Sequence, residues 1–218
     1  MADIDFDWLN RHSDEILHRT VEHVEIVAIS MVVAVAVSVP IGIAVRGRRV
    51  PFGIVTGIGG LLYTIPSLAL FAFLIPWLGI GRDPVIVGLV AYSLLILVRN
   101  TVVGLEGVPA PVLEAARGMG LTRRQTLLKV ELPLALPSIM AGIRLATVSA
   151  VGIATIGTLI GAGGLGYLIY NEGLNQDFLT PVVAGAVCAT VLAIVLDVLL
   201  LLAERALEPW ARVRTQPS

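Results

Sequence analysis

Charged residues are scarce in this sequence. They make up 14% of the 218 residues, whereas a soluble domain typically carries about a quarter. Hydrophobic residues make up 56%, and the mean hydropathy is +0.90. This composition excludes an ordinary soluble domain and predicts a membrane protein. Because the net charge is only −1, nothing indicates a nucleic-acid partner, and we expect none.

Cysteine and lysine occur once each, which limits the available chemistry. Cys188 has no second cysteine with which to form an internal disulfide. A nucleotide-binding P-loop needs the pattern G-x-x-x-x-G-K-[ST], and the single lysine, Lys129, follows Leu128 instead of glycine. We therefore expect no ATPase activity and no bound cofactor in this chain. No Ser/His/Asp or Cys/His set falls within the apolar segments, so we predict no catalytic residue and disfavour a membrane enzyme.

The first 21 residues are polar and acidic and lack the basic start and apolar core of a secretory signal. We expect residues 1–21 to form an extracytoplasmic helix that starts near Ser13 and lies along the membrane surface. All three histidines, His12, His18 and His23, lie near this segment, at spacings of six and five that do not share one helical face. We interpret them as solvated surface and predict no metal site.

Five apolar segments are long enough to cross a bilayer, which needs about 20 residues. They lie at residues 22–45, 52–78, 84–103, 133–160 and 181–202. They predict an all-α, polytopic membrane helix bundle over residues 22–204, with a tail at 205–218.

The second segment contains a break. Pro66 cannot donate a hydrogen bond to the carbonyl of Leu62, so the helix must kink or open there. Broken backbone at membrane depth is tolerated only against protein or a watery cavity. We therefore predict a transport path lined by Tyr63, Thr64, Pro66 and Ser67.

The loop between the third and fourth segments reads as two short helices. Pro109 suits a helix start, and Gly120 suits a helix stop because glycine enters the left-handed conformation without steric cost. Thr122 and Gln125 form a capping-box pattern that opens a second helix, which we expect Pro133 to end.

The first of these helices has a smooth surface and a carboxylate, which suits it to lying in a groove on another protein. We predict that this loop, residues 104–132, contacts a partner through Glu114, Ala115, Ala116, Arg117, Gly118, Gly120, Arg123 and Arg124.

The loop resembles a known element. Its Glu-Ala-Ala at residues 114–116, then Gly120, then Leu-Pro at 132–133, is similar to the coupling loop of permease subunits of ATP-binding-cassette importers. TIPSLAL at 64–70, RNT at 99–101, MAGIR at 140–144 and GAGGLG at 161–166 are similar to permeases for osmoprotectants such as glycine betaine, carnitine, choline and proline betaine. Tyr167 departs from that family, which often has Asp there.

The resemblance implies a five-span type I importer permease fold in a bacterial cytoplasmic membrane. It implies a cytoplasmic coupling loop docked on an ATPase dimer, which would bind ATP and Mg²⁺. It also implies a second permease chain, identical or sister. Because no binding domain is fused to this chain, a separate extracytoplasmic substrate-binding protein is expected.

Positive charge favours the same orientation, because Lys and Arg are retained on the cytoplasmic side. With the coupling loop inside, the outer segments hold only Arg11, Arg19 and Arg82. The inner segments then hold eleven: Arg46, Arg48, Arg49, Arg99, Arg117, Arg123, Arg124, Lys129, Arg205, Arg212 and Arg214. We therefore expect the N-terminus outside and the C-terminus inside.

Two charges fall within the apolar segments. A charged side chain in lipid is energetically costly. It usually pairs with an opposite charge or extends to the membrane–water interface. We predict an ion pair between Arg144 and Asp197, with independent partners as the alternative.

The glycine run at 161–166 fits the dinucleotide fingerprint G-x-G-x-x-G letter for letter. That fingerprint requires a preceding strand and a βαβ unit, whereas the neighbours here are membrane helices. We expect these glycines to allow close backbone packing.

A quaternary ammonium has no N–H and is recognised by aromatic rings. Tyr63, Phe71, Phe73 and Trp77 lie in the segment with the break, and we favour Tyr63 as a contact for such a cation. The alternative is that these rings face lipid or pack internally. Three other functions remain open: a methionine or sulfonate permease, a passive channel, and the disfavoured membrane enzyme.

Overall fold

The computed structural model describes residues 4–207; Arg212 and Arg214 of the expected tail lie outside them. The described residues form helices and no strand, as predicted. In chain order these are α1 (Phe6–Arg11), α2 (Ser13–Val45), α3 (Arg49–Thr64), α4 (Ser67–Leu78), α5 (Arg82–Glu106), α6 (Ala110–Gly118), α7 (Arg123–Thr126), the π-helix η1 (Leu127–Glu131), α8 (Leu132–Ala154), the 3₁₀-helix η2 (Thr155–Ile160), the π-helix η3 (Leu168–Gly173), the 3₁₀-helix η4 (Leu174–Gln176) and α9 (Leu179–Leu207).

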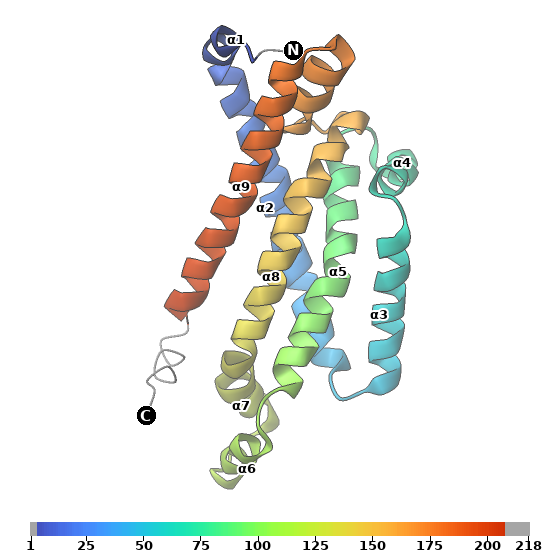
Figure 1. Ribbon diagram of the computed structural model, residues 1–218. Helices are drawn as coiled ribbons and strands as arrows, with labels where there is room; N and C mark the ends of the chain where they lie inside the picture. Colours follow the sequence, from blue (N-terminus) through green and yellow to red (C-terminus); the bar gives the residue numbers. More distant parts are fainter. Residues whose placement is uncertain (1–3, 208–218) are drawn as a thin grey trace.

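The long helices lie side by side and form an elongated bundle (Figure 1). α6 and α7 project from one end, whereas α1 and the glycine run lie at the other. α2, α5 and α8 share the main apolar core, which includes Ile26, Leu89 and Val151. α5 and α8 approach closely at Gly142, where an added Cβ would lie 2.6 Å from the Cβ of Asn100. A small residue at this contact is what close helix packing in a membrane requires.

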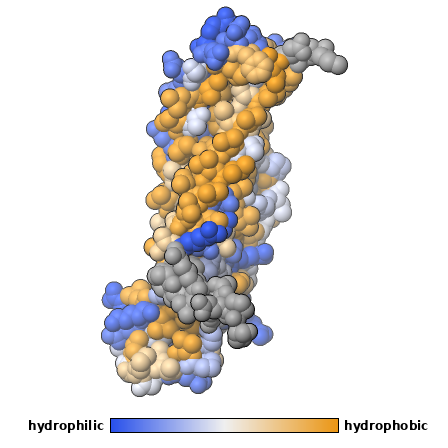
Figure 2. Space-filling model, turned by 60° about the vertical axis from the view of Figure 1, so that its left-hand side comes forward, coloured by the Kyte–Doolittle hydropathy of each residue, from blue (hydrophilic) through white to orange (hydrophobic). Residues whose placement is uncertain are grey.

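Within residues 4–207, four helical stretches are long and apolar enough to cross a membrane: Ser13–Val45, Arg82–Glu106, Arg123–Ile160 and Leu179–Leu207. α3 and α4 pass the same test together but are bent by 101°, so a fifth span exists only if this pair is one broken crossing. The predicted segment 52–78 is therefore not one straight helix. Figure 2 shows that apolar residues cover the middle of the face in view and that hydrophilic residues gather at its two ends.

The expected boundary at residue 21 is wrong, because α2 runs unbroken from Ser13 to Val45. Its charged first turns pair with one another, Arg19 with Glu15 at 3.3 Å and with Glu22 at 3.0 Å, so the helix continues through them. The short helix before it packs on the end of the bundle, where Trp8 is buried beside Leu165 and Leu168.

Pro133 does not end the second loop helix, which is a further correction. Helical structure continues from Arg123 to Ile160, with Pro133 in the first turn of α8. The π-helix η1 comes directly before it, and the Leu132 N–H donates to the Leu127 carbonyl five residues earlier. This widened turn shifts the hydrogen-bond register and accommodates the proline ring.

Candidate functional site

The α6 helix begins and ends as the sequence predicts. Pro109 is its N-cap, and Gly120 beyond its end has φ +79°. The Leu121 N–H donates to the Ala116 carbonyl at 3.1 Å, the six-to-one bond of a Schellman stop. The predicted capping box is also present: Thr122 and Gln125 each accept a hydrogen bond from the other's backbone N–H. The projecting end is therefore a defined structure built from local signals.

Most predicted coupling residues lie on the surface of this end. Ala116 is the exception, since only 1% of it is exposed, so its predicted contact with a partner is wrong. It packs inside the chain because it lies on the inner face of α6. The exposed residues of the set are Glu114, Ala115, Arg117, Gly118, Gly120, Arg123 and Arg124.

An exposed apolar stripe runs along α6. Val112, Ala115 and Met119 follow one another at spacings of three and four, so they share one face, and Met119 is 72% exposed. Sequence reasoning missed Val112 and Met119, although their helical spacing around Ala115 could have revealed them. Helices that dock in a groove present apolar anchors at this spacing.

The projecting end is tied to the bundle by charged groups. Arg46 at the end of α2 forms an ion pair with Glu131 of η1. The Glu106 carboxylate at the end of α5 accepts a hydrogen bond from the Gly47 N–H at 2.9 Å. Movement of α6 and α7 would therefore be transmitted to α2 and α5.

The predicted break lies between α3 and α4 at the expected place. α3 ends at Thr64, and Pro66 is the N-cap of α4. The backbone between them is held by α5, because the Tyr92 hydroxyl donates to the Ile65 carbonyl at 2.7 Å. The structure brings the four predicted path residues together here: Tyr63, Thr64 and Pro66 are exposed and Ser67 is half-buried.

The aromatic residues near the break differ in role. Tyr63 is 45% exposed and meets Tyr92 edge to face, with ring centroids 5.7 Å apart. Phe71 is fully buried, so it packs internally and cannot line a path. Phe73 and Trp77 are 65% and 68% exposed on the outside of α4. Tyr63 alone among these four combines exposure with a position at the break.

The glycine run forms a tight turn. Residues 4–207 contain no strand, so the strand that a dinucleotide-binding fingerprint requires is not present before this turn. The turn is held by two neighbouring residues of α2. The Gly164 N–H donates to the Glu22 carboxylate at 3.0 Å. Close packing is confirmed at Gly166, where an added Cβ would lie 1.9 Å from the Thr155 carbonyl oxygen.

His23 is fully buried, so its interpretation as solvated surface is wrong. Its Nδ1 accepts a hydrogen bond from the Leu165 N–H at 3.3 Å, and its Nε2 lies 3.1 Å from the Val151 carbonyl oxygen. A neutral imidazole protonated on Nε2 satisfies both bonds. The residue therefore links α2 to α8 and to the glycine turn.

Tyr167, directly after the glycine run, has a charged partner. The Arg19 guanidinium lies over the Tyr167 ring, 3.7 Å from its centroid. A tyrosine ring attracts a cation to its face. Nearby, burial and the Glu15 carboxylate raise the pKa of Glu172. This end of the bundle is therefore a dense network of charges.

The predicted ion pair is present. Arg144 of α8 contacts Asp197 of α9, and its Nη1 also lies 3.4 Å from the Glu204 carboxylate. Sequence reasoning missed Glu204, although it follows Asp197 by seven residues and so shares its helical face.

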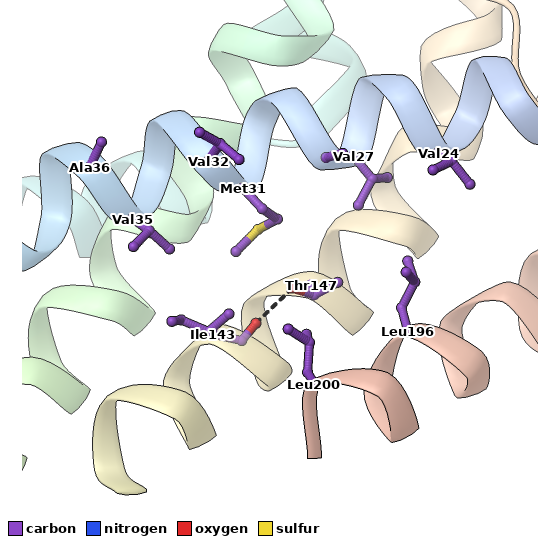
Figure 3. Close-up of a pocket in the computed structure, with 11 residues that line it drawn as sticks. Val24, Val27, Met31, Val32, Val35, Ala36, Ile143, Thr147, Leu196 and Leu200 are labelled. Carbon is purple, nitrogen blue, oxygen red and sulfur yellow. Dashed lines mark hydrogen bonds between the residues drawn. The ribbon is translucent and has the colours of Figure 1, made fainter. Parts of the chain in front are cut away.

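A groove with a volume of about 470 Å³ lies between α2, α8 and α9. Apolar side chains such as Met31, Ile143 and Leu200 line it (Figure 3). Its one hydroxyl, that of Thr147, is directed to the Ile143 carbonyl at 2.8 Å. The groove therefore offers no polar group to a soluble substrate.

Comparisons with known proteins agree with this architecture. A family model described as binding-protein-dependent transport system inner membrane component matches residues 34–210. The chain is 44% identical over 202 residues to the choline transport system permease protein OpuBB of Bacillus subtilis (strain 168), covering 93% of both chains. It is 42% identical to the glycine betaine/carnitine/choline transport system permease protein OpuCB of the same organism, again covering 93% of both. It is 40% identical to the carnitine transport permease protein OpuCB of Listeria monocytogenes, covering 94% of this chain and 93% of that one.

A solved structure has the same fold. It shows inward facing conformations of the MetNI methionine ABC transporter and matches with a TM-score of 0.78 and 26% identity, covering 88% of this chain and 96% of that one. The importer permease fold expected from the resemblance is therefore confirmed.

Proposed function

The chain belongs to the family of binding-protein-dependent transport system inner membrane components, and on that premise we propose that it forms the path for a quaternary-ammonium osmoprotectant such as choline, carnitine or glycine betaine. It is the multi-pass permease subunit of an ATP-binding-cassette importer in the inner membrane, which implies ATPase and substrate-binding partners. We propose a complex of two permease chains, identical or sister, an ATPase dimer and an extracytoplasmic binding protein. We assign the binding of ATP and Mg²⁺ to the ATPase, and we assign no bound cofactor to this chain.

The observation that carries the coupling mechanism is the apolar stripe on α6. Val112, Ala115 and Met119 are exposed along one face of α6, beside the exposed charges of Glu114 and Arg117. Burying them in a cleft of the ATPase would remove apolar surface from water, which is the main favourable term in protein association. Arg117, Arg123 and Arg124 are placed to contact the rim, and Glu114 to anchor the loop.

The end with α6 and α7 is assigned to the cytoplasm. α1 and the glycine turn lie at the opposite end of the bundle (Figure 1), which is then extracytoplasmic and faces the binding protein. The excess of arginine on the α6 side supports this orientation.

The mechanism is alternating access. ATP-driven closure of the ATPase dimer displaces α6, and the ion pair of Arg46 with Glu131 passes the displacement to α2. The bundle then opens outward and accepts the substrate from its binding protein. On its way inward the cation meets the exposed ring of Tyr63, with Thr64 and Ser67 as polar neighbours.

Reconstitution tests the proposal. The permease, its co-eluting ATPase and the binding protein are placed in liposomes, and uptake of labelled choline, carnitine and glycine betaine is measured with and without ATP. We expect uptake of at least one of them only when ATP and both partners are present. Solute flux from liposomes that hold the permease alone would indicate a passive channel. A binding protein that selects methionine or a sulfonate would replace the proposed substrate class.

A further inference from the structure

The bend between α3 and α4 depends on a side chain from a third helix. Helix ends leave backbone carbonyls that need other partners. At this break the partner of the Ile65 carbonyl is the Tyr92 hydroxyl, at 2.7 Å. Tyr92 is 5% exposed and Ile65 is half-buried, so this bond lies in a partly buried place, where a hydrogen bond is stronger than in water.

The same side chain contacts the other side of the break. The Tyr92 ring meets the ring of Tyr63 in the last turn of α3 at an interplanar angle of 83°. Edge-to-face contact is a preferred arrangement of aromatic pairs and fixes both rings. Tyr92 therefore holds the backbone at the bend between α3 and α4 through its hydroxyl, and it holds Tyr63 through its ring.

One helical turn earlier, α5 also anchors α4. Gly88 faces the buried ring of Phe71, and an added Cβ there would lie 2.5 Å from the Phe71 Cε1. Gly88 and Tyr92 are four residues apart and so share one face of α5. A single face of α5 thus contacts α4 at Phe71 and the bend itself at Ile65, and these two contacts define the 101° angle between α3 and α4.

We propose that Tyr92 is a positioning residue of the transport path: it holds the bend between α3 and α4 and keeps the Tyr63 ring on the exposed surface, facing the cation. This inference rests on the proposed function. A ring binds a quaternary ammonium through its face, so rotation of Tyr63 would weaken binding without removing any group.

The first experiment measures the bend and does not depend on transport. Cysteines for spin labels replace Ile58 on α3 and Ala72 on α4, both exposed, in a Cys188→Ala chain within the full complex in lipid nanodiscs. We expect Tyr92→Phe, which removes only the hydroxyl, to shift or broaden the distance distribution. Tyr170→Phe alters a tyrosine on η3, which is far in sequence from the bend between α3 and α4, and should leave the distance distribution unchanged.

The second experiment measures uptake of labelled choline by the same variants without labels. We expect Tyr92→Phe to raise KM about two- to tenfold, the range that loss of one hydrogen bond corresponds to, with Vmax per assembled complex unchanged. An unchanged distance distribution in Tyr92→Phe overturns the proposal whatever the uptake. A changed distribution with unchanged KM reduces Tyr92 to a structural role and also overturns it. If wild-type complex shows no ATP-driven uptake, the proposed function fails, while the distances still report on the bend.

Discussion

Arg144 and Asp197 form a two-point ion pair between α8 and α9. The Arg144 Nε lies 2.8 Å from one carboxylate oxygen of Asp197, and its Nη2 lies 3.0 Å from the other. Such paired geometry suits the planar guanidinium and is unavailable to lysine. Together with the contact of the same guanidinium with Glu204 at 3.4 Å, the pair is a directional link between α8 and α9.

A double-mutant cycle tests this link. We expect Arg144→Ala and Asp197→Ala each to lower the midpoint of thermal unfolding. Arg144→Ala leaves the Asp197 and Glu204 carboxylates without their cation, and Asp197→Ala leaves Arg144 with only the longer Glu204 contact. The double variant should be no less stable than either single variant. Strict additivity of the two effects would mean that the residues do not interact. Arg144→Lys should recover only part of the loss, since lysine cannot make both contacts.

Because His23 is buried and makes two hydrogen bonds, we expect its replacement to lower the stability of the fold strongly. His23→Ala leaves the Leu165 N–H and the Val151 carbonyl without their partners and should reduce the free energy of unfolding by about 2–5 kcal/mol. His18 is the matched control: its side chain is 67% exposed, so His18→Ala should change stability by no more than about 0.5 kcal/mol. Chemical unfolding in mild detergent measures both. Equal small effects would show that the two bonds of His23 do not stabilise the fold.

Local signals predicted more of this structure than tertiary contacts did. The Thr122–Gln125 capping box and the left-handed Gly120 depend on neighbours within a few residues, so the sequence contains all the information they need. The break at Pro66 follows from the missing N–H of one residue. Helix continuity through Pro133 could not be predicted, because it depends on a π-helical turn that no short motif specifies.

Buried polar residues were the other source of error. His23 resembles a surface residue in sequence, since it lies one turn after Arg19, and only the glycine turn at 161–166 folding back over it explains its burial. Arg144 and Asp197 were predicted correctly because a charge within an apolar span needs a partner, and few were available. The 53 residues that separate them in sequence offered no other indication of contact.

Tyr63→Ala tests the cation contact in the path. Loss of a partly desolvated aromatic face should raise KM for choline about two- to thirtyfold, because such contacts contribute roughly 0.5–2 kcal/mol. Tyr63→Phe keeps the ring and should stay close to wild type. Uptake must be normalised to the amount of assembled complex. Unchanged KM in Tyr63→Ala would remove Tyr63 from the path and leave it as a packing partner of Tyr92.

Gly118→Leu separates docking of α6 from its folding. No atom lies within 4 Å of an added Cβ at Gly118, and its φ is not left-handed, so the isolated permease should keep its stability. The larger side chain would obstruct a close-fitting cleft on the ATPase, and we expect co-purification of the ATPase or coupled uptake to fall about tenfold or more. Gly118→Ala, which adds one methyl group, should co-purify and take up substrate nearly as the wild type does.

Gly120→Leu should also uncouple ATP hydrolysis from uptake, but it is a weaker test, because φ +79° strains any side chain there before docking is considered. If Gly118→Leu couples normally, α6 does not lie in a close-fitting cleft, because a leucine side chain can be added there without loss only where the partner leaves room.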